Sequence, residues 1–158
     1  EKVAVSSGFI TYPNLVTDIS SKIGGQSVVV ILDVKRNLFG KYEVFTHNGK
    51  VRTNKSPLEL AKLAVNIGAG EIVINSINLD GAMSGYDLIL AKNLRNAVNV
   101  PISIMGGAGN LNDMKKLFNT CGVVGAIAGS LFVFKGALKA VLINYPYGSE
   151  KDDLVENN

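Results

Sequence analysis

Two aspartates stand where predicted strands give way to loops, and they are the side chains best suited to chemistry. Asp33 lies near the end of the apolar run 28–34, and Asp80 follows the β-branched run 72–77. Carboxylates at the carboxyl end of a parallel sheet can exchange protons with a ligand held over it. A salt bridge with a neighbouring cation for Asp33 and an Asx-type turn for Asp80 are the structural alternatives. Their matching positions favour a functional role.

Small and polar residues accompany these carboxylates. Asn75 and Ser76 lie near the end of the strand that precedes Asp80, and Gly81, directly after Asp80, makes the backbone there more flexible. Gly106-Gly107-Ala108-Gly109 and Gly129-Ser130 end the next two strands along the chain. Such turns offer backbone N–H groups without a side chain in the way, as in the phosphate sites of many barrels. The glycines of either turn alone could be needed only for the backbone conformation of a simple turn, but the two turns together predict an anion site.

A regular alternation of elements must position these residues. Strands are predicted to begin near residues 3, 28, 72, 102 and 125, with helices between them at 14–23, 56–66, 88–97 and 112–119. A small hairpin is predicted at 42–46 and 50–52, because Asn48-Gly49 favours a type I′ turn. The βα repetition predicts an α/β fold with parallel strands, as either a doubly wound sheet or a (βα)8 barrel.

If the fold is a barrel, these 158 residues form only part of it, since a complete (βα)8 barrel usually needs about 250 residues. We therefore expect one partial TIM-barrel domain over residues 1–146, with its N-terminal units upstream, and a flexible tail over 147–158.

Composition excludes several classes of function. The chain is 47% hydrophobic and 18% charged, which is typical of a soluble globular protein. A net charge of +3 without a dense basic cluster does not indicate nucleic-acid binding. Cys121 is alone and His47 is the single histidine, so no internal disulfide and no zinc cluster are expected. The apolar runs are too short to span a bilayer, and no signal peptide is recognised. We therefore expect a cytoplasmic protein that uses no cofactor and no metal.

Several motifs together resemble a known enzyme family, the cyclase subunit of imidazole glycerol phosphate synthase (HisF). They are Val-Ile-Leu-Asp-Val-Lys-Arg at 30–36, Glu-Val-Phe-Thr-His-Asn-Gly at 43–49, Gly-Ala-Gly-Glu-Ile at 68–72, Asn-Leu-Asp-Gly-Ala-Met-Ser-Gly-Tyr-Asp at 78–87, Gly-Gly-Ala-Gly-Asn at 106–110 and Ala-Gly-Ser-Leu-Phe at 128–132. The resemblance covers about residues 1–135. It implies strands four to eight of a (βα)8 barrel with their helices, and a small hairpin after the fifth strand.

This resemblance implies a carbon–nitrogen lyase of histidine biosynthesis. Ammonia from a glutamine amidotransferase partner would convert a phosphorylated ribulosyl aminoimidazole carboxamide nucleotide into imidazole glycerol phosphate and an aminoimidazole carboxamide ribotide. Asp33 matches one of the family's two acid–base aspartates, and the other belongs to the first strand, which lies outside this sequence.

The remaining matches assign binding roles. Asp80 corresponds to a substrate-site aspartate, and Asn75 and Ser76 stand beside it. One phosphate site is matched by Gly81, Gly106, Gly107, Gly129 and Ser130, and the other by Ser6, Ser7 and Gly8. Lys2 and Glu71 match charged residues of the gate through which ammonia enters the barrel.

The chain also departs from the family pattern. Asn78 stands where the cyclase usually has Asp, Met105 where it has Ser, and Ser6 where it has Asn. The segment 140–146 resembles HisF-like proteins of surface-polysaccharide amidation. An ammonia-delivering subunit for sugar amidation is therefore the alternative function, and an inactive fragment is a third hypothesis.

Overall fold

The computed structural model describes residues 1–136 and 138–154. Its elements are β1 (Val3–Val5), α1 (Ser7–Thr11), α2 (Asn14–Ile23), the 3-10 turn η1 (Gly25–Ser27), β2 (Val28–Arg36), β3 (Tyr42–Thr46), β4 (Val51–Arg52), α3 (Pro57–Asn66), β5 (Glu71–Ser76), α4 (Leu88–Ala97), β6 (Ile102–Met105), α5 (Leu111–Cys121), β7 (Gly125–Ile127), α6 (Ser130–Val133), β8 (Phe134–Lys135), β9 (Ala140–Val141) and α7 (Gly148–Asp152). The five strands of the predicted βα alternation are all present.

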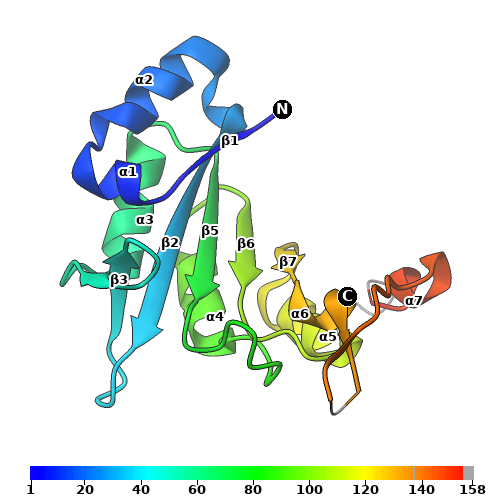
Figure 1. Ribbon diagram of the computed structural model, residues 1–158. Helices are drawn as coiled ribbons and strands as arrows, with labels where there is room; N and C mark the ends of the chain where they lie inside the picture. The colour runs from blue at the N-terminus through cyan, green and yellow to red at the C-terminus, as the bar shows by residue number, and fades with distance from the viewer. Residues whose placement is uncertain (137, 155–158) are drawn as a thin grey trace.

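These five strands form one parallel sheet in the order of the chain. β1 pairs with β2, β2 with β5, β5 with β6, and β6 with β7, always in parallel. The strand order does not reverse within the described residues, whereas a doubly wound sheet reverses at its switch point. The α/β class is therefore confirmed, and the mostly parallel sheet is consistent with a partial TIM barrel (Figure 1).

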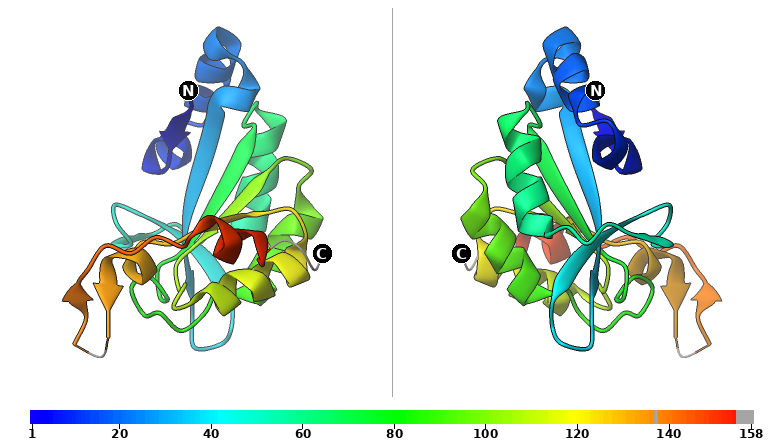
Figure 2. Two further views of the ribbon diagram at one scale, coloured as in Figure 1. Left: turned by 90° about the vertical axis from the view of Figure 1, so that its right-hand side faces the viewer. Right: turned by 90° about the vertical axis from the view of Figure 1, so that its left-hand side faces the viewer.

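Helices α3, α4 and α5 cover one face of this sheet (Figure 2). Alternate strand residues such as Leu32, Ile74 and Ile104 point to that face and are at most 1% exposed. They pack with Leu94 of α4 and Leu117 of α5 in one apolar core. Because successive strand residues face opposite ways, the residues between them form a second face, which carries the polar groups described below.

The predicted hairpin is confirmed, with a longer loop than expected. β3 pairs antiparallel with the last four residues of β2, and β4 pairs with β3. Thr46 pairs with Val51, so four residues connect the strands in place of a tight Asn-Gly turn. His47, Asn48 and Gly49 all have positive φ, which explains the Asn-Gly sequence signal.

Further features that the sequence did not predict lie near the ends of the chain. The first strand begins at Val3, as predicted, and ends at Val5, and the short helix α1, which was not predicted, follows it. Near the other end, β8 and β9 form a small hairpin of their own. Helix α7 lies within the segment predicted to be a flexible tail, of which residues 155–158 are outside the described residues.

In the described part of the chain, every helix is too short or too polar to cross a membrane.

Candidate functional site at the carboxyl edge of the sheet

The last residues of the parallel strands form one row across the sheet. Asp33 of β2 pairs in register with Asn75 of β5, Asn75 with Met105 of β6, and Met105 with Ile127 of β7. Parallel strands present their carboxyl ends at one edge, so the loops that follow these residues share that edge. The structure therefore brings Asp33 and the two glycine turns to the same end of the sheet.

Asp33 is held by its neighbour in this row. Asn75 Nδ2 donates a hydrogen bond of 2.9 Å to Asp33 Oδ1, and both residues are half-buried. Asn75 Oδ1 is buried without a hydrogen-bond partner. A buried acceptor of this kind costs free energy until a donor reaches it. The pair thus offers an oriented carboxylate next to an unpaired amide oxygen, an arrangement able to bind and deprotonate an N–H or O–H group.

A cavity of about 170 Å³ lies at the same edge of the sheet, between the loops that follow β5, β6 and β7, and neither Asp33 nor Asn75 lines it. It is lined by Asp80, Gly81, Met105, Gly106, Gly107, Ala108, Ile127, Ala128, Gly129 and Ser130. Its volume suits a small group such as a phosphate better than a whole nucleotide. All six residues predicted from the turns after these three strands line it.

The glycines of the cavity differ in whether the backbone and its surroundings require glycine at that position. Gly106 and Gly107 have φ of +92° and +108°, and a Cβ on Gly107 would lie 2.0 Å from the carbonyl oxygen of Gly85. The fold itself therefore requires glycine at these two positions. Gly129 has a φ of −115°, and nothing lies within 4 Å of the site of a Cβ. Packing does not explain Gly129, whereas close approach of a ligand would.

Not every predicted residue faces this cavity. Ser76 follows Asn75 and points to the opposite, helix-covered face, where its Oγ is buried without a partner. Ser6, Ser7 and Gly8 lie just after β1, at the same edge of the sheet but outside the cavity. Ser7 Oγ accepts a hydrogen bond of 3.2 Å from the backbone N–H of His47. His47 itself is exposed, and this hydrogen bond places its backbone beside the residues that follow β1.

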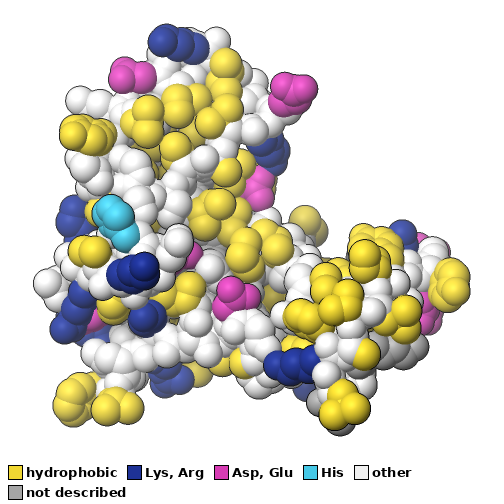
Figure 3. Space-filling model, in the orientation of Figure 1, with side chains coloured by type: hydrophobic (Ala, Val, Ile, Leu, Met, Phe, Trp, Pro, Cys, Tyr) yellow, Lys and Arg dark blue, Asp and Glu magenta, His cyan; other side chains and the backbone are white. Residues whose placement is uncertain are grey.

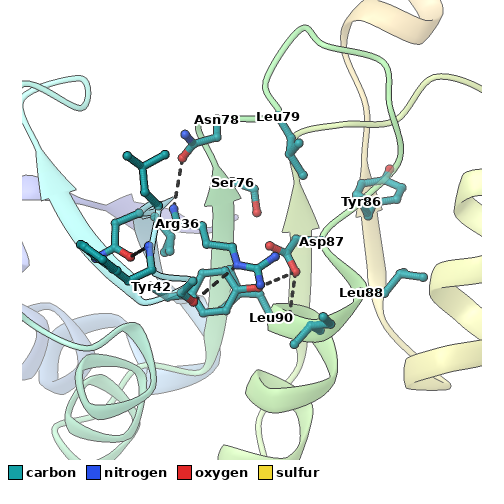
Figure 4. Close-up of a pocket in the computed structure, with 15 residues that line it drawn as sticks. Arg36, Tyr42, Ser76, Asn78, Leu79, Tyr86, Asp87, Leu88 and Leu90 are labelled. Atoms are coloured by element: carbon teal, nitrogen blue, oxygen red, sulfur yellow. Dashed lines mark hydrogen bonds between the residues drawn. The ribbon is translucent and has the colours of Figure 1, made fainter.

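A larger pocket of about 810 Å³ lies on the helix side of the same edge (Figure 4). Asp87 accepts hydrogen bonds from Tyr42 Oη at 2.9 Å and from the backbone N–H of Leu90 at 3.0 Å. Burial and the hydrogen bond to Asp87 raise the pKa of Tyr42 to about 12, so the phenol is neutral at pH 7. Ser76 and Arg36 also line the pocket. Sequence reasoning missed this pocket, although Asp87 directly before a helical pattern is a capping signal.

The predicted gate residues meet at the opposite end of the sheet. Lys2 Nζ donates to Glu71 Oε2 at 2.5 Å, and Ser103 Oγ donates to Glu71 Oε1 at 2.7 Å. Burial acts to raise the pKa of Glu71, but the hydrogen bonds from Lys2 and Ser103 outweigh it and lower that pKa. Sequence reasoning missed Ser103, whose signal is a single hydroxyl between the isoleucines of β6.

Residues that could hold a metal ion do not gather in this structure. Within residues 1–136 and 138–154, no three His, Cys, Asp or Glu side chains are grouped for metal binding. What the two ends of the sheet do offer is a half-buried carboxylate at the same edge as a small glycine-lined cavity at one end, and an ion pair between the exposed Lys2 and the mostly buried Glu71 at the other.

Comparisons with known proteins agree with this arrangement. A family model described as "Histidine biosynthesis protein" matches residues 1–139. "Putative imidazole glycerol phosphate synthase subunit HisF" of Leptospira interrogans is 50% identical over 155 residues, 98% of this chain and 61% of that protein. The similarly named subunit hisF3 of Vibrio vulnificus is 48% identical over 157 residues, 99% of this chain and 60% of that protein. "Imidazole glycerol phosphate synthase subunit HisF" of Alkaliphilus metalliredigens is 38% identical over 132 residues, 84% of this chain and 52% of that protein.

The chain thus spans 60–61% of the length of the first two of these relatives. The resemblance to HisF that was read from the motifs is confirmed by these matches. With the matching model covering most of its residues, the chain belongs to the histidine biosynthesis protein family.

Proposed function

We propose that this chain forms the carboxyl-terminal part of a HisF-type cyclase. In this proposal, ammonia and a phosphorylated ribulosyl aminoimidazole carboxamide nucleotide yield imidazole glycerol phosphate and an aminoimidazole carboxamide ribotide. The observation that carries the proposal is the 170 Å³ cavity, in which Asp80, Gly129 and Ser130 come together with the other glycines beside the row of Asp33.

Each part of the carboxyl edge has a role in this reaction. Asp33 transfers protons as a general acid and base, and Asn75 holds its carboxylate in place through the 2.9 Å hydrogen bond. The glycine-lined cavity binds one phosphate group through backbone N–H groups and Ser130. Ser6, Ser7 and Gly8 contact the second phosphate.

The opposite end of the sheet admits ammonia in this proposal. Lys2 and Glu71 form the gate, and a glutamine amidotransferase docks at that end to supply the ammonia. An ion pair suits a gate because one charged side chain can swing aside without unfolding a strand. The partner, the nucleotide and the second aspartate all belong to the proposal for the whole protein, of which this chain is one part.

The test uses full-length protein with the nucleotide and an ammonium salt, and follows imidazole glycerol phosphate by chromatography. We expect product with the wild type and a loss of at least about 10³-fold in kcat with Asp33→Asn, since the amide cannot exchange the proton. Gly129→Val fills the cavity and should raise KM for the nucleotide with a smaller effect on kcat. Equal turnover by wild type and Asp33→Asn would refute the role of Asp33.

Ammonia delivery for sugar amidation is a second candidate, favoured by three specific observations. Asn78 Oδ1 accepts a hydrogen bond from the backbone N–H of Arg36, so this side chain fastens the loop to the end of β2. Met105 lines the cavity where the cyclase usually has a serine. The relatives at 48–50% identity also align over 155–157 residues, and the one at 38% over only 132. Absence of any cyclised product with ammonium salt would favour this second function.

The third hypothesis, an inactive fragment, has its own test. The purified 158-residue chain should show no turnover under the same conditions, because the second acid–base aspartate belongs to a strand outside it. Turnover by this chain alone would remove that hypothesis.

A further inference from the structure

Ser103 is a buried hydroxyl whose position nothing in the apolar core explains. It is 9% exposed and lies on the second face of the sheet, in a register row with Ile31, Val73 and Gly125. The side chains on either side of it in this row are therefore apolar or absent. A buried hydroxyl without a partner is unfavourable, so its 2.7 Å hydrogen bond to Glu71 Oε1 is the reason it is tolerated.

The space for this hydroxyl is made by a glycine on the neighbouring strand. A Cβ on Gly125 would lie 2.2 Å from Ser103 Oγ and 3.0 Å from Ser103 Cβ. Ser103 and Gly125 are register partners in β6 and β7, so the contact cannot be relieved by a small loop movement. The backbone φ of Gly125 does not require glycine, since it is not among the residues with positive φ. Glycine at position 125 thus leaves the space that the Ser103 hydroxyl occupies.

The two donors to Glu71 differ in their freedom to move. The side chain of Lys2 is 55% exposed and that of Glu71 is 15% exposed. An ion pair with one partner this exposed contributes little to stability, so Lys2 can leave it at small cost. Ser103 lies on β6, which is paired with β5 on one side and β7 on the other, so Ser103 cannot move when Lys2 moves.

We propose that Ser103 is a positioning residue of the gate, which holds Glu71 in place while Lys2 moves. Glu71 is then the fixed half of the pair and Lys2 the moving half, and Gly125 is the position that makes this arrangement sterically allowed. Calling the pair a gate rests on the proposed function, whereas the positioning of Glu71 by Ser103 does not.

The test measures the carboxyl ¹³C shift of Glu71 against pH in this chain with labelled glutamate. In Ser103→Ala we expect the pKa of Glu71 to rise by about one pH unit, because the ionised form loses one hydrogen-bond donor. Ser103→Thr keeps a hydroxyl and should restore the wild-type value. Gly125→Ala keeps the serine but displaces its hydroxyl, and should also raise the pKa.

The matched control is Ser76→Ala, which removes another buried serine hydroxyl, one without a partner and on the opposite face of β5. It should leave the pKa of Glu71 at the wild-type value. An unchanged pKa in both Ser103→Ala and Gly125→Ala would overturn the proposal, and so would an equal rise in Ser76→Ala.

A second measurement separates this inference from the proposed function. In the full-length protein assembled with a glutaminase, the ratio of glutamine-supported to ammonium-supported product formation should fall several-fold in Ser103→Ala. If the pKa of Glu71 rises but this ratio does not change, Ser103 positions Glu71 and the pair is not a gate. That result would refute the gate and leave the positioning role confirmed.

Discussion

At the scale of single residues, the carboxyl edge depends on one side-chain hydrogen bond. Asn75 and Asp33 are 42 residues apart in the chain, and they meet because β2 and β5 pair in parallel register. The amide donates one hydrogen bond to Asp33 and keeps a buried oxygen free. Asn75 thus restricts where the Asp33 carboxylate can point.

Asn75→Leu removes this restriction while keeping a side chain of similar size. In the full-length protein, assayed for the proposed cyclase reaction, we expect kcat to fall by about tenfold to a hundredfold, which corresponds to one lost orienting hydrogen bond. Thermal unfolding of the variant should stay close to wild type, because the residue is only half-buried. Steady-state kinetics of the variant check this, and an unchanged kcat would show that Asp33 needs no orientation by Asn75.

Two paired carboxylates make the stability of the chain depend on acid pH. Hydrogen bonds from Arg52 lower the pKa of Glu43, and the Lys2 and Ser103 hydrogen bonds lower that of Glu71 against the effect of burial. In the unfolded chain both groups return to ordinary values near 4.5. The unfolded state therefore binds more protons below that pH, so stability is full above it and is lost as the pH falls through the lowered folded values.

Denaturant unfolding measured from pH 7 to pH 3 should show this loss beginning near pH 4.5. Glu71→Gln removes one titrating group, so the free energy of unfolding should vary less steeply with pH over that range. A slope equal to that of the wild type would contradict the assigned hydrogen bonds of Glu71.

At the scale of elements, the loops after β5 and β6 are locked together by glycine. The backbone N–H of Gly85 donates to Gly107 O at 2.7 Å, and Gly107 leaves no room for a Cβ against Gly85 O. The cavity wall therefore depends on glycine at 107 for its shape, whereas Gly129 on the facing loop is free to vary sterically.

Gly107→Ala and Gly129→Ala should separate folding from binding. We expect Gly107→Ala to lower the free energy of unfolding by about 2 kcal/mol or more, since it adds both a clash and a strained φ. Gly129→Ala should unfold at the wild-type temperature. Thermal denaturation followed by circular dichroism compares the two, and equal melting temperatures would show that the loop can relax around Gly107.

The helix α5 begins with a side-chain cap that α3 lacks. Asn110 Oδ1 accepts from the backbone N–H of Asp113, and Asp113 accepts from the backbone N–H of Asn110 in return. Ser56 occupies the same position before α3 but makes no side-chain hydrogen bond there. The two helices thus offer a matched comparison of capping.

Asn110→Ala should destabilise the chain by about 1 kcal/mol, lowering its melting temperature by roughly 2–4 °C. Ser56→Ala should change it by clearly less, because no side-chain cap bond is lost. A thermal shift of equal size in both variants would contradict the assigned cap.

At the scale of the whole molecule, apolar side chains gather at several places on the surface. Figure 3 shows them over the sheet face turned to the viewer and over the C-terminal segment. In the latter, Leu138, Ile143 and Tyr147 are 78–96% exposed. β1 and β7 each pair with one neighbouring strand within the described residues. Exposed apolar groups and unpaired strand edges together favour association.

The 16.8 kDa chain should therefore self-associate at micromolar concentration. Light scattering coupled to size exclusion should give a mass that grows with loading concentration. Ile143→Lys places a charge in the exposed C-terminal region and should shift the equilibrium towards monomer. A constant monomeric mass at all concentrations would show that these surfaces do not associate.

The sequence by itself determined the elements and their local chemistry. Helices α2, α3 and α4 and strand β6 lie where the sequence predicts them, and the glycine turns follow the predicted strands. These features depend on neighbours along the chain, namely side-chain spacing, proline and glycine, and so can be read without a fold. The motifs, taken together, also sufficed for the family, which the comparisons confirmed.

Only the tertiary structure decided which side chains share a face. Asn75 and Ser76 are neighbours in sequence, yet one contacts Asp33 and the other lies against the helix layer. Ser103 reaches Glu71 because parallel strands bring residues 32 positions apart into contact. The physical reason is register: the alternation of a strand leaves two faces available, and only pairing with its neighbours and burial under the helices select which residues meet.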